Sequence, residues 1–144
     1  RVFNVHFASL HFDSQDYEAL EGGVPDAEVR ERMWSRMKQA YALRVDQVKA
    51  VLAAVENSPH PVLLCGDFND TPVSWTLSTL RSTLRDAHDV QGFRMDGTWQ
   101  GAVPGVRIDH VLVDPSWEVL SYQTGGNGLS DHRFVAAELR VLNP

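Results

Sequence analysis

Six polar side chains in this sequence lie next to short apolar runs and are of the types that phosphoryl chemistry uses. They are His6, Asp67, Asn69, Asp109, Asp131 and His132. Carboxylate and amide oxygens are ligands that Mg²⁺ and Mn²⁺ prefer, and a histidine can contact a phosphate or move a proton. Cleavage of a phosphate ester needs a cation to neutralise the phosphate, an acceptor to orient water and donors to the phosphate oxygens. The six residues include candidates for each role.

Each of these residues also has a purely structural interpretation. Asp67 and Asn69 follow Gly66 in the stretch GDFND, where Gly, Asp and Asn are common turn formers. Asp109 is compatible with a sheet edge at the surface, and Asp131 with a turn cap. The two histidines are compatible with ordinary core or surface positions. The constellation is therefore more informative than any single member.

Hydrophobic periodicity indicates which elements position these residues. We expect strands over residues 1–7, 61–65, 106–113, 117–122 and 133–141, helices over 27–57 and 71–80, a loop over 8–25, and a short strand near 98–99. We expect strand 117–122 to form a hairpin with strand 106–113, and strand 61–65 to be buried on both faces. This order of elements predicts a layered α/β sheet domain, in which ligand sites collect at the carboxyl ends of strands.

The segment 27–57 has the pattern of a long amphipathic helix, with Asp26 as its N-cap. Its apolar residues recur at spacings of three and four, and its other face carries charged residues. Those charged residues are Arg30, Glu31, Arg36, Lys38, Arg44 and Lys49. The basic residues of the chain thus lie mainly on this helix, and we expect them to be remote from the strand ends.

Length and charge narrow the class of protein. A chain of 144 residues is one domain or part of one, and its 43% hydrophobic residues can form a sizeable core. A net charge of −6 argues against a non-specific nucleic-acid binder, because such proteins are usually basic. The single cysteine excludes an internal disulfide. Because a strand is predicted from the first residue onward, we expect the chain to be cut from a longer protein.

Three blocks of this sequence resemble, in order, the signature segments of the endonuclease/exonuclease/phosphatase superfamily. They are Gly66–Asn69 (GDFN), Arg107–Val111 (RIDHV) and Ser130–His132 (SDH). The opening Phe3–Phe7 is similar to the family strand that delivers a histidine, and the four blocks together cover nearly all of the chain. The long helix running into PVLLCGDFNDTPVSWT is most similar to bacterial members known only at family level. The resemblance implies a DNase I-like fold, a four-layer α/β (α+β) sandwich with mixed, mostly antiparallel sheets.

The resemblance also implies roles for the first group of candidate residues. Asp67 would orient or deprotonate the attacking water and would contact the metal. Asn69 would contact the phosphate and hold Asp67 in place. Asp131 would be a metal ligand, completed by a glutamate that this chain does not contain. The implied cofactor is Mg²⁺, with Mn²⁺ as the second candidate.

The remaining candidates would act on the phosphate, by the same resemblance. His132 would donate to a phosphate oxygen, and Asp109 would fix its tautomer by accepting from the other ring nitrogen, as an orienting carboxylate does for a catalytic histidine. His6 would be a second phosphate contact or the acid that protonates the leaving group. Its own orienting carboxylate is expected outside this chain.

Residues 1–144 would then be the C-terminal part of one domain, with the N-terminal half absent. Alone, such a half exposes an apolar sheet face, which invites a partner. We expect that partner to be the missing N-terminal half, or a second copy in a homodimer. The parent protein is expected to be bacterial, and both a cytoplasmic and a membrane-anchored parent are left open.

The sequence therefore predicts a metal-dependent phosphoester hydrolase, with phosphodiesters favoured on family frequency. Two alternatives are a catalytically incomplete half-domain or binding module, and a nuclease acting on DNA or RNA. Lipid, small-molecule and nucleic-acid phosphate esters all stay open as substrates. The loop 8–25, with Phe12 and Tyr17, is a candidate substrate rim, or simple cover over the long helix.

Overall fold

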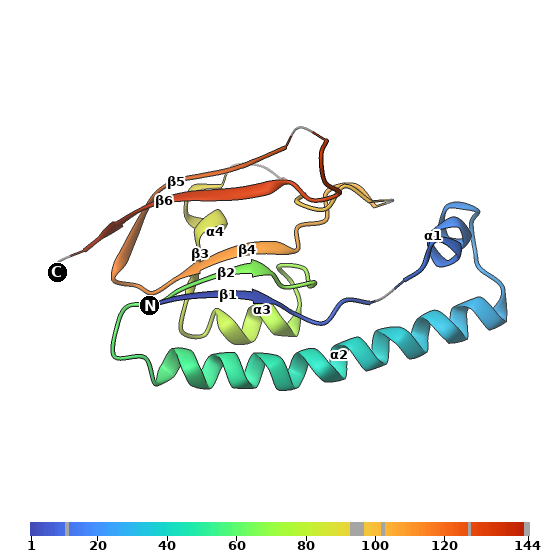
Figure 1. Cartoon of the computed structure of the whole chain (residues 1–144), viewed down its shortest axis with the longest axis horizontal. Helices are drawn as coiled ribbons and strands as arrows, with labels where there is room; N and C mark the ends of the chain where they lie inside the picture. Colours follow the sequence, from blue (N-terminus) through green and yellow to red (C-terminus); the bar gives the residue numbers. More distant parts are fainter. Residues whose placement is uncertain (11, 93–96, 102, 127, 143–144) are drawn as a thin grey trace.

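A computed structural model of the chain describes residues 1–10, 12–92, 97–101, 103–126 and 128–142. A four-stranded sheet lies between a helical layer and a two-stranded sheet (Figure 1). The elements are β1 (Val2–His6), α1 (Ser14–Glu21), α2 (Ala27–Glu56), β2 (Leu63–Asp67), α3 (Trp75–Leu80), β3 (Arg85–Asp86), α4 (Ala87–Gln91), β4 (Asp109–Val113), β5 (Trp117–Gly125) and β6 (Phe134–Val141). The predicted α/β class is confirmed. In the described part of the chain, no helix has the length and apolarity needed to cross a bilayer.

The larger sheet has strand order β1-β2-β4-β3, and it is mixed but mostly antiparallel. β1 pairs with β2 in parallel, whereas the β2–β4 and β3–β4 pairs are antiparallel. The parallel β1–β2 pair is joined by a long crossover through α2, as parallel strands require. Both strands therefore end at the same edge of the sheet.

Two cores form because side chains of β2 and β4 alternate between the faces of the sheet. Leu64 and Leu112, which are partners in register, are fully buried against α2 and α3. Their neighbours Cys65 and Val111 point to the opposite face, where β5 and β6 cover the sheet. Leu63 and Cys65 pack against this second core but stay partly exposed, so the prediction that this strand is buried on both faces is confirmed for one face and only in part for the other.

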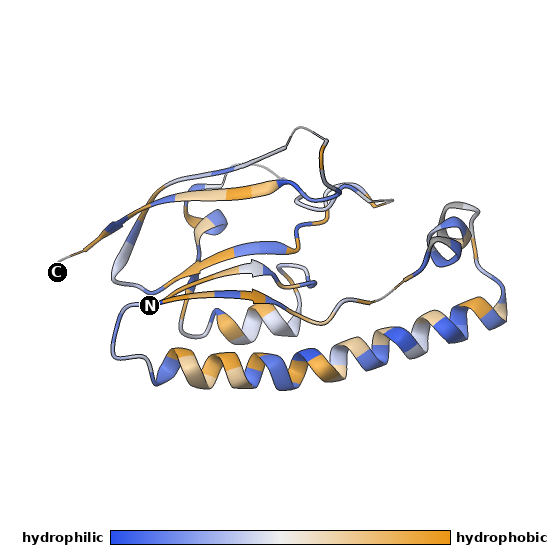
Figure 2. Ribbon diagram, in the orientation of Figure 1, coloured by the Kyte–Doolittle hydropathy of each residue, from blue (hydrophilic) through white to orange (hydrophobic). Residues whose placement is uncertain are grey.

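Helix α2 confirms the predicted long helix and its N-cap. The Val29 N–H donates to Asp26 Oδ1 at 2.9 Å, and Asn57 ends the helix. Hydrophobic residues run along the part of α2 under the sheet, and the N-terminal part extends beyond it (Figure 2). The helix thus spans the sheet and also reaches the region past the strand ends.

Helix α1 packs on the projecting end of α2, where a loop over 8–25 was predicted (Figure 1). Asp13 and Asp16 form a reciprocal capping box at its start. The fully buried Asp16 carboxylate accepts hydrogen bonds from Arg32 and Arg36 of α2. Capping and ion pairs form this helix, so a search for hydrophobic periodicity missed it.

The predicted hairpin between 106–113 and 117–122 is wrong. Residues 114–116 carry the chain from one sheet to the other, and β5 pairs with β6. The Asp114 carboxylate accepts from the N–H and hydroxyl of Ser116 and holds this turn. β5 instead packs its apolar face, through Val119, onto the face of the larger sheet that carries Val111. The apolar pattern was correct for both strands, but it does not specify which strand pairs with which.

Candidate active site

Three candidate residues form a row across adjacent strands of the larger sheet. His6 at the end of β1 is in register with Asp67 at the end of β2, and Asp67 is in register with Asp109 at the start of β4. The His6 Nε2 lies 3.4 Å from Asp67 Oδ2. His6 is largely exposed, whereas the two carboxylates are mostly covered. The sheet itself therefore places an imidazole and two carboxylates side by side.

His132 joins this row from the segment that leads into β6. Its Nδ1 lies 2.8 Å from Asp109 Oδ2. An ionised carboxylate can only accept, so Nδ1 carries the proton, and Nε2 is the ring atom that can act on a substrate. The His132 backbone is held by a hydrogen bond from its N–H to Ser130 Oγ and by a bridge to Trp99.

Asn69 holds the Asp67 carboxylate from both sides. Its N–H donates to Asp67 Oδ1 at 2.8 Å, and its amide Nδ2 donates to Asp67 Oδ2 and to the Phe7 carbonyl, each at 3.0 Å. Asn69 adopts a left-handed conformation with φ of 49°, which asparagine tolerates better than most residues. Asn69 thus orients the Asp67 carboxylate, and its hydrogen bond to Phe7 connects the loop after β2 to the segment after β1.

The surroundings of Asp67 and His132 shift both pKa values upward. Partial burial raises the pKa of Asp67, and the nearby charge of Asp109 adds to this, while the Asn69 N–H opposes it. For His132, partial burial lowers the pKa, but the hydrogen bond to Asp109 and the charges of Asp109, Asp67 and Asp131 outweigh it, so the pKa is raised. The site therefore favours a carboxylate that accepts protons more readily than usual beside an imidazolium.

Asp67, Asp109 and His132 offer ligand atoms that all lie within 4.8 Å of one another. Nδ1 of His132 is already engaged by Asp109, which leaves Asp67 as the carboxylate of this group best suited to a cation. Asp131, predicted as the metal ligand, is exposed and lines the same pocket without being part of this group. One or two carboxylates, with water and phosphate oxygens, are what Mg²⁺ usually takes from a protein. Asp67 is therefore a candidate ligand, and the role of Asp131 stays a prediction.

Arg44 is a site residue that the sequence analysis misplaced. Predicted on the charged outer face of α2, it is only 1% exposed and reaches the loop after β2. Its guanidinium donates to the Asn69 carbonyl, lies 3.5 Å from Asp70 Oδ2 and stacks under Tyr41. The expectation that basic residues lie away from the strand ends is therefore wrong for Arg44. The signal was present, because Arg44 lies four residues from both Ala40 and Val48 on the buried side of the helix.

His110, to which we assigned no role, lies behind the site in a buried polar network. Its Nε2 is 3.0 Å from the Asp70 carbonyl, and its Nδ1 is 2.9 Å from Arg107. Arg107 in turn donates to both oxygens of Asp86. The network links the loop after β2 to β3 through β4, so it supports the segment that carries Asp67.

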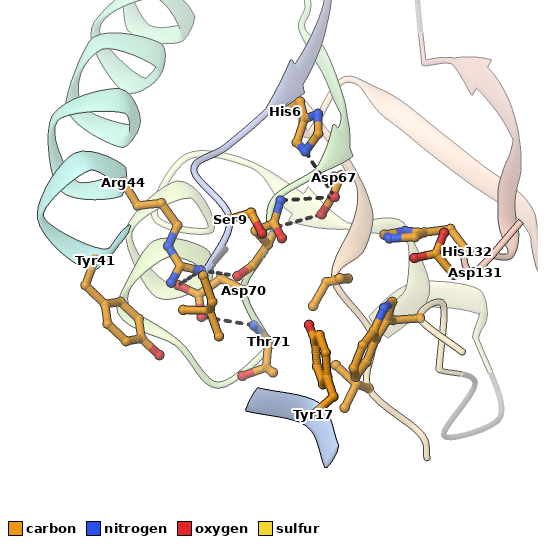
Figure 3. Close-up of a pocket in the computed structure, with 15 residues that line it drawn as sticks. His6, Ser9, Tyr17, Tyr41, Arg44, Asp67, Asp70, Thr71, Asp131 and His132 are labelled. Atoms are coloured by element: carbon orange, nitrogen blue, oxygen red, sulfur yellow. Dashed lines mark hydrogen bonds and ion pairs between the residues drawn. The ribbon is translucent and has the colours of Figure 1, made fainter. Parts of the chain in front are cut away.

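Most of the candidate residues line one pocket of about 420 Å³, drawn in Figure 3. His6, Asp67, Asn69, Asp131 and His132 line one part of it, and Asp109 contributes through His132. Tyr17 of α1 and Trp99 also line the pocket, together with the apolar residues Leu10, Val106 and Ile108. The volume suits a small ligand.

Residues 4–132 match the family described as Endonuclease/Exonuclease/phosphatase family. No curated protein matches the chain significantly. Among solved structures, a functionally unknown conserved protein from Enterococcus faecalis aligns with a TM-score of 0.66 and 19% identity, over 97% of this chain and 49% of its own. This chain therefore spans about half the length of that protein.

Two further solved structures show the same fold. An endonuclease/exonuclease/phosphatase from Bacteroides vulgatus aligns with a TM-score of 0.61 and 22% identity, over 69% of this chain and 44% of its own. A mannosyl-6-phosphatase from Bacteroides thetaiotaomicron aligns with a TM-score of 0.54 and 20% identity, over 96% and 50%. The predicted DNase I-like architecture is confirmed by such neighbours.

Proposed function

The chain belongs to the endonuclease/exonuclease/phosphatase family, and from this premise we propose that its protein is a metal-dependent phosphoester hydrolase. Family membership supports phosphoester hydrolysis in general. The observation that carries the proposal is the row of His6, Asp67 and Asp109 on adjacent strands, completed by the 2.8 Å contact between Asp109 and His132. It provides a proton acceptor, a proton donor and an orienting carboxylate at one pocket.

In the proposed reaction, Asp67 accepts a proton from the water whose oxygen attacks phosphorus. His132, oriented by Asp109, donates from Nε2 to a phosphate oxygen. The bond between phosphorus and the leaving oxygen breaks, and that oxygen takes its proton from His6, the exposed imidazole at the end of β1. Mg²⁺, or Mn²⁺ as the second candidate, would be held by Asp67 and Asp131 and would neutralise charge on the phosphate.

We favour phosphodiesters as substrates, on family frequency. Phosphomonoesters are the second candidate class, because one structural neighbour carries the name mannosyl-6-phosphatase. A nuclease is a weaker candidate, since a polynucleotide needs several Lys or Arg contacts to its phosphates. Among the described residues that line the pocket, Arg44 is the sole Lys or Arg, and its guanidinium is buried.

We also propose that the site is completed by protein outside this chain. The chain spans about half the length of its structural neighbours, so a remaining metal ligand is expected from a preceding half of the domain. A second copy of the chain, as a homodimer across the exposed sheet face, is the alternative source. A binding module with no turnover is the outcome if neither supplies the ligand.

The test is hydrolysis of bis(p-nitrophenyl) phosphate with and without Mg²⁺, by the complete protein and by this chain. The Asp67→Ala variant is expected to lose activity by several orders of magnitude with its fold intact. Asp46→Ala, an exposed acid on α2, is the matched control and should behave as wild type. Metal-independent activity, or activity that survives in Asp67→Ala, would contradict the proposal.

A further inference from the structure

Part of the pocket wall beside the phosphate-directed residues is built from aromatic rings. Tyr17 and Trp99 lie with ring centroids 5.9 Å apart and planes tilted by 40°. Tyr17 enters the pocket from α1, and the charge of Asp131 acts on its hydroxyl, so the ring lies near the catalytic residues (Figure 3). None of the roles assigned above uses these rings.

Trp99 is held in a fixed position relative to His132. Its backbone forms an antiparallel bridge with His132, so the ring follows the same local strand geometry as the catalytic imidazole. Gly101 packs directly on the indole, where any Cβ would overlap the six-membered ring. The glycine therefore provides the space that this ring occupies.

Tyr17 is held by its neighbour in sequence. Asp16 is fully buried and accepts from Arg32 and Arg36 of α2, which anchors α1 beside the pocket. Phe12 meets the Tyr17 ring edge-on, with centroids 6.0 Å apart. Two elements far apart in sequence thus present preorganised rings to the same cavity, and such rings lose little entropy when they bind a ligand.

We propose that Tyr17 and Trp99 form a subsite for a ring on the alcohol group of a small phosphate ester. The proposal rests on the proposed function, because the phosphate must lie at Asp67 and His132 for the alcohol to reach this wall. A cavity of about 420 Å³ holds one phosphate and one ring. The apolar neighbours Leu10 and Ile108 suit the edge of a ring better than a chain of phosphates or a charged group.

The test compares two phosphonates that resist hydrolysis, phenylphosphonate and methylphosphonate, by calorimetry on the complete protein with Mg²⁺ present. Because a ring can stack on these aromatic side chains, wild type should bind the phenyl compound about tenfold more tightly. Trp99→Ala and Tyr17→Ala should each reduce this preference to about twofold, with methylphosphonate binding unchanged. Trp34→Ala, an exposed tryptophan on α2 outside this pocket, is the control and should retain the preference.

Two further variants test placement of the rings without removing either one. Gly101→Ala should displace the indole, and Asp16→Asn should loosen α1; both should weaken phenylphosphonate binding selectively. Methylphosphonate binding with no phenyl preference in wild type, or a preference that survives in both Trp99→Ala and Tyr17→Ala, would overturn the subsite alone. Failure of wild type to bind either phosphonate would overturn the proposed function and the subsite with it.

Discussion

His132 Nδ1 and Asp109 Oδ2 lie 2.8 Å apart although Asp109 lies in the larger sheet and His132 on the segment that leads into the smaller one. Asp109 begins β4 in the larger sheet, and His132 precedes β6 in the smaller one. The hydrogen bond therefore depends on how the two sheets pack, through the core that contains Val111 and Val119. This packing sets both the orientation and the pKa of the imidazole.

Replacing Asp109 with Asn should impair the proposed reaction severely, because the neutral amide no longer stabilises and orients the imidazolium that donates from Nε2. We expect kcat to fall by roughly 10² to 10⁴, as for other orienting carboxylates. Asp109 raises the pKa of His132, so this pKa should fall in the variant, as measured by NMR titration without divalent cations. Glu138→Gln, an exposed change on β6, is the control. An unchanged His132 titration would refute the role of Asp109.

Replacing Arg44 with Lys should slow the reaction by altering Asp67 through Asn69. Lysine keeps the charge but lacks the planar guanidinium, which lies over the Tyr41 ring while its Nη1 contacts the Asn69 carbonyl and Asp70. The Asn69 N–H lowers the pKa of Asp67, so a looser Asn69 should raise it and move the acid limb of the pH–rate profile to higher pH. Lys49→Ala, exposed on the same helix, is the control. A loss of thermal stability without any movement of this limb would show that Arg44 is only structural.

The local patterns of the sequence predicted much of what positions the site. The Asp26 cap, the long helix and the apolar runs of β2, β4, β5 and β6 all follow from nearest-neighbour chemistry, which a sequence displays directly. For His6, Asp67 and Asp109, the sequence predicted only that they are polar residues near strand ends. It did not predict that they lie side by side. Their register required the pairing of three strands, which depends on long-range packing.

The failures also have physical causes. Arg44 lies on the buried side of α2, where its guanidinium lies over the Tyr41 ring and its Nη1 contacts the loop after β2, whereas charge alone predicts the opposite. β5 pairs with β6 because both cover the same apolar face, and no local signal distinguishes that partner from β4. Asp131 was predicted to bind a metal by resemblance, and its role stays a prediction.

Replacing Asp131 with Ala should raise the Mg²⁺ concentration needed for half-maximal activity. Asp131 is exposed at the mouth of the pocket and is not required by the core, so folding should be unaffected. With one carboxylate removed we expect roughly a tenfold or greater increase in the apparent metal constant. The measurement is a Mg²⁺ titration of initial rates, repeated with Mn²⁺, beside Asp46→Ala. An unchanged metal requirement would exclude Asp131 as a ligand.

The buried Asp86 should make folding stability depend on pH in the acid range. Burial raises the pKa of Asp86, but hydrogen bonds and charges of His110 and Arg107 outweigh it and lower the pKa from 3.8 to about 2. Because the folded pKa is depressed, this stabilisation is present above about pH 4 and is lost as the pH falls toward 2. Asp86→Asn should be less stable at neutral pH, since Arg107 loses its buried partner.

The stability gap between wild type and Asp86→Asn should accordingly shrink as the pH falls from about 4 to about 2. Urea denaturation at several pH values measures this gap. Asp46→Asn, on the exposed face of α2, should show no such gap. A gap that stays constant over this range would mean that the ion pair does not set the pKa of Asp86.

Replacing Gly66 with Ala should destabilise the edge of the sheet that carries the site. Gly66 has a φ of 135°, and a Cβ there would overlap the carbonyl of Val5 on the paired strand β1. Strain at such a position and the overlap together should cost at least about 2 kcal/mol of unfolding free energy. Because His6 and Asp67 are the next residues along these two strands, activity should fall further than stability. Gly128→Ala, also at positive φ but with open space around it, is the matched control and should lower stability by the smaller cost of backbone strain alone.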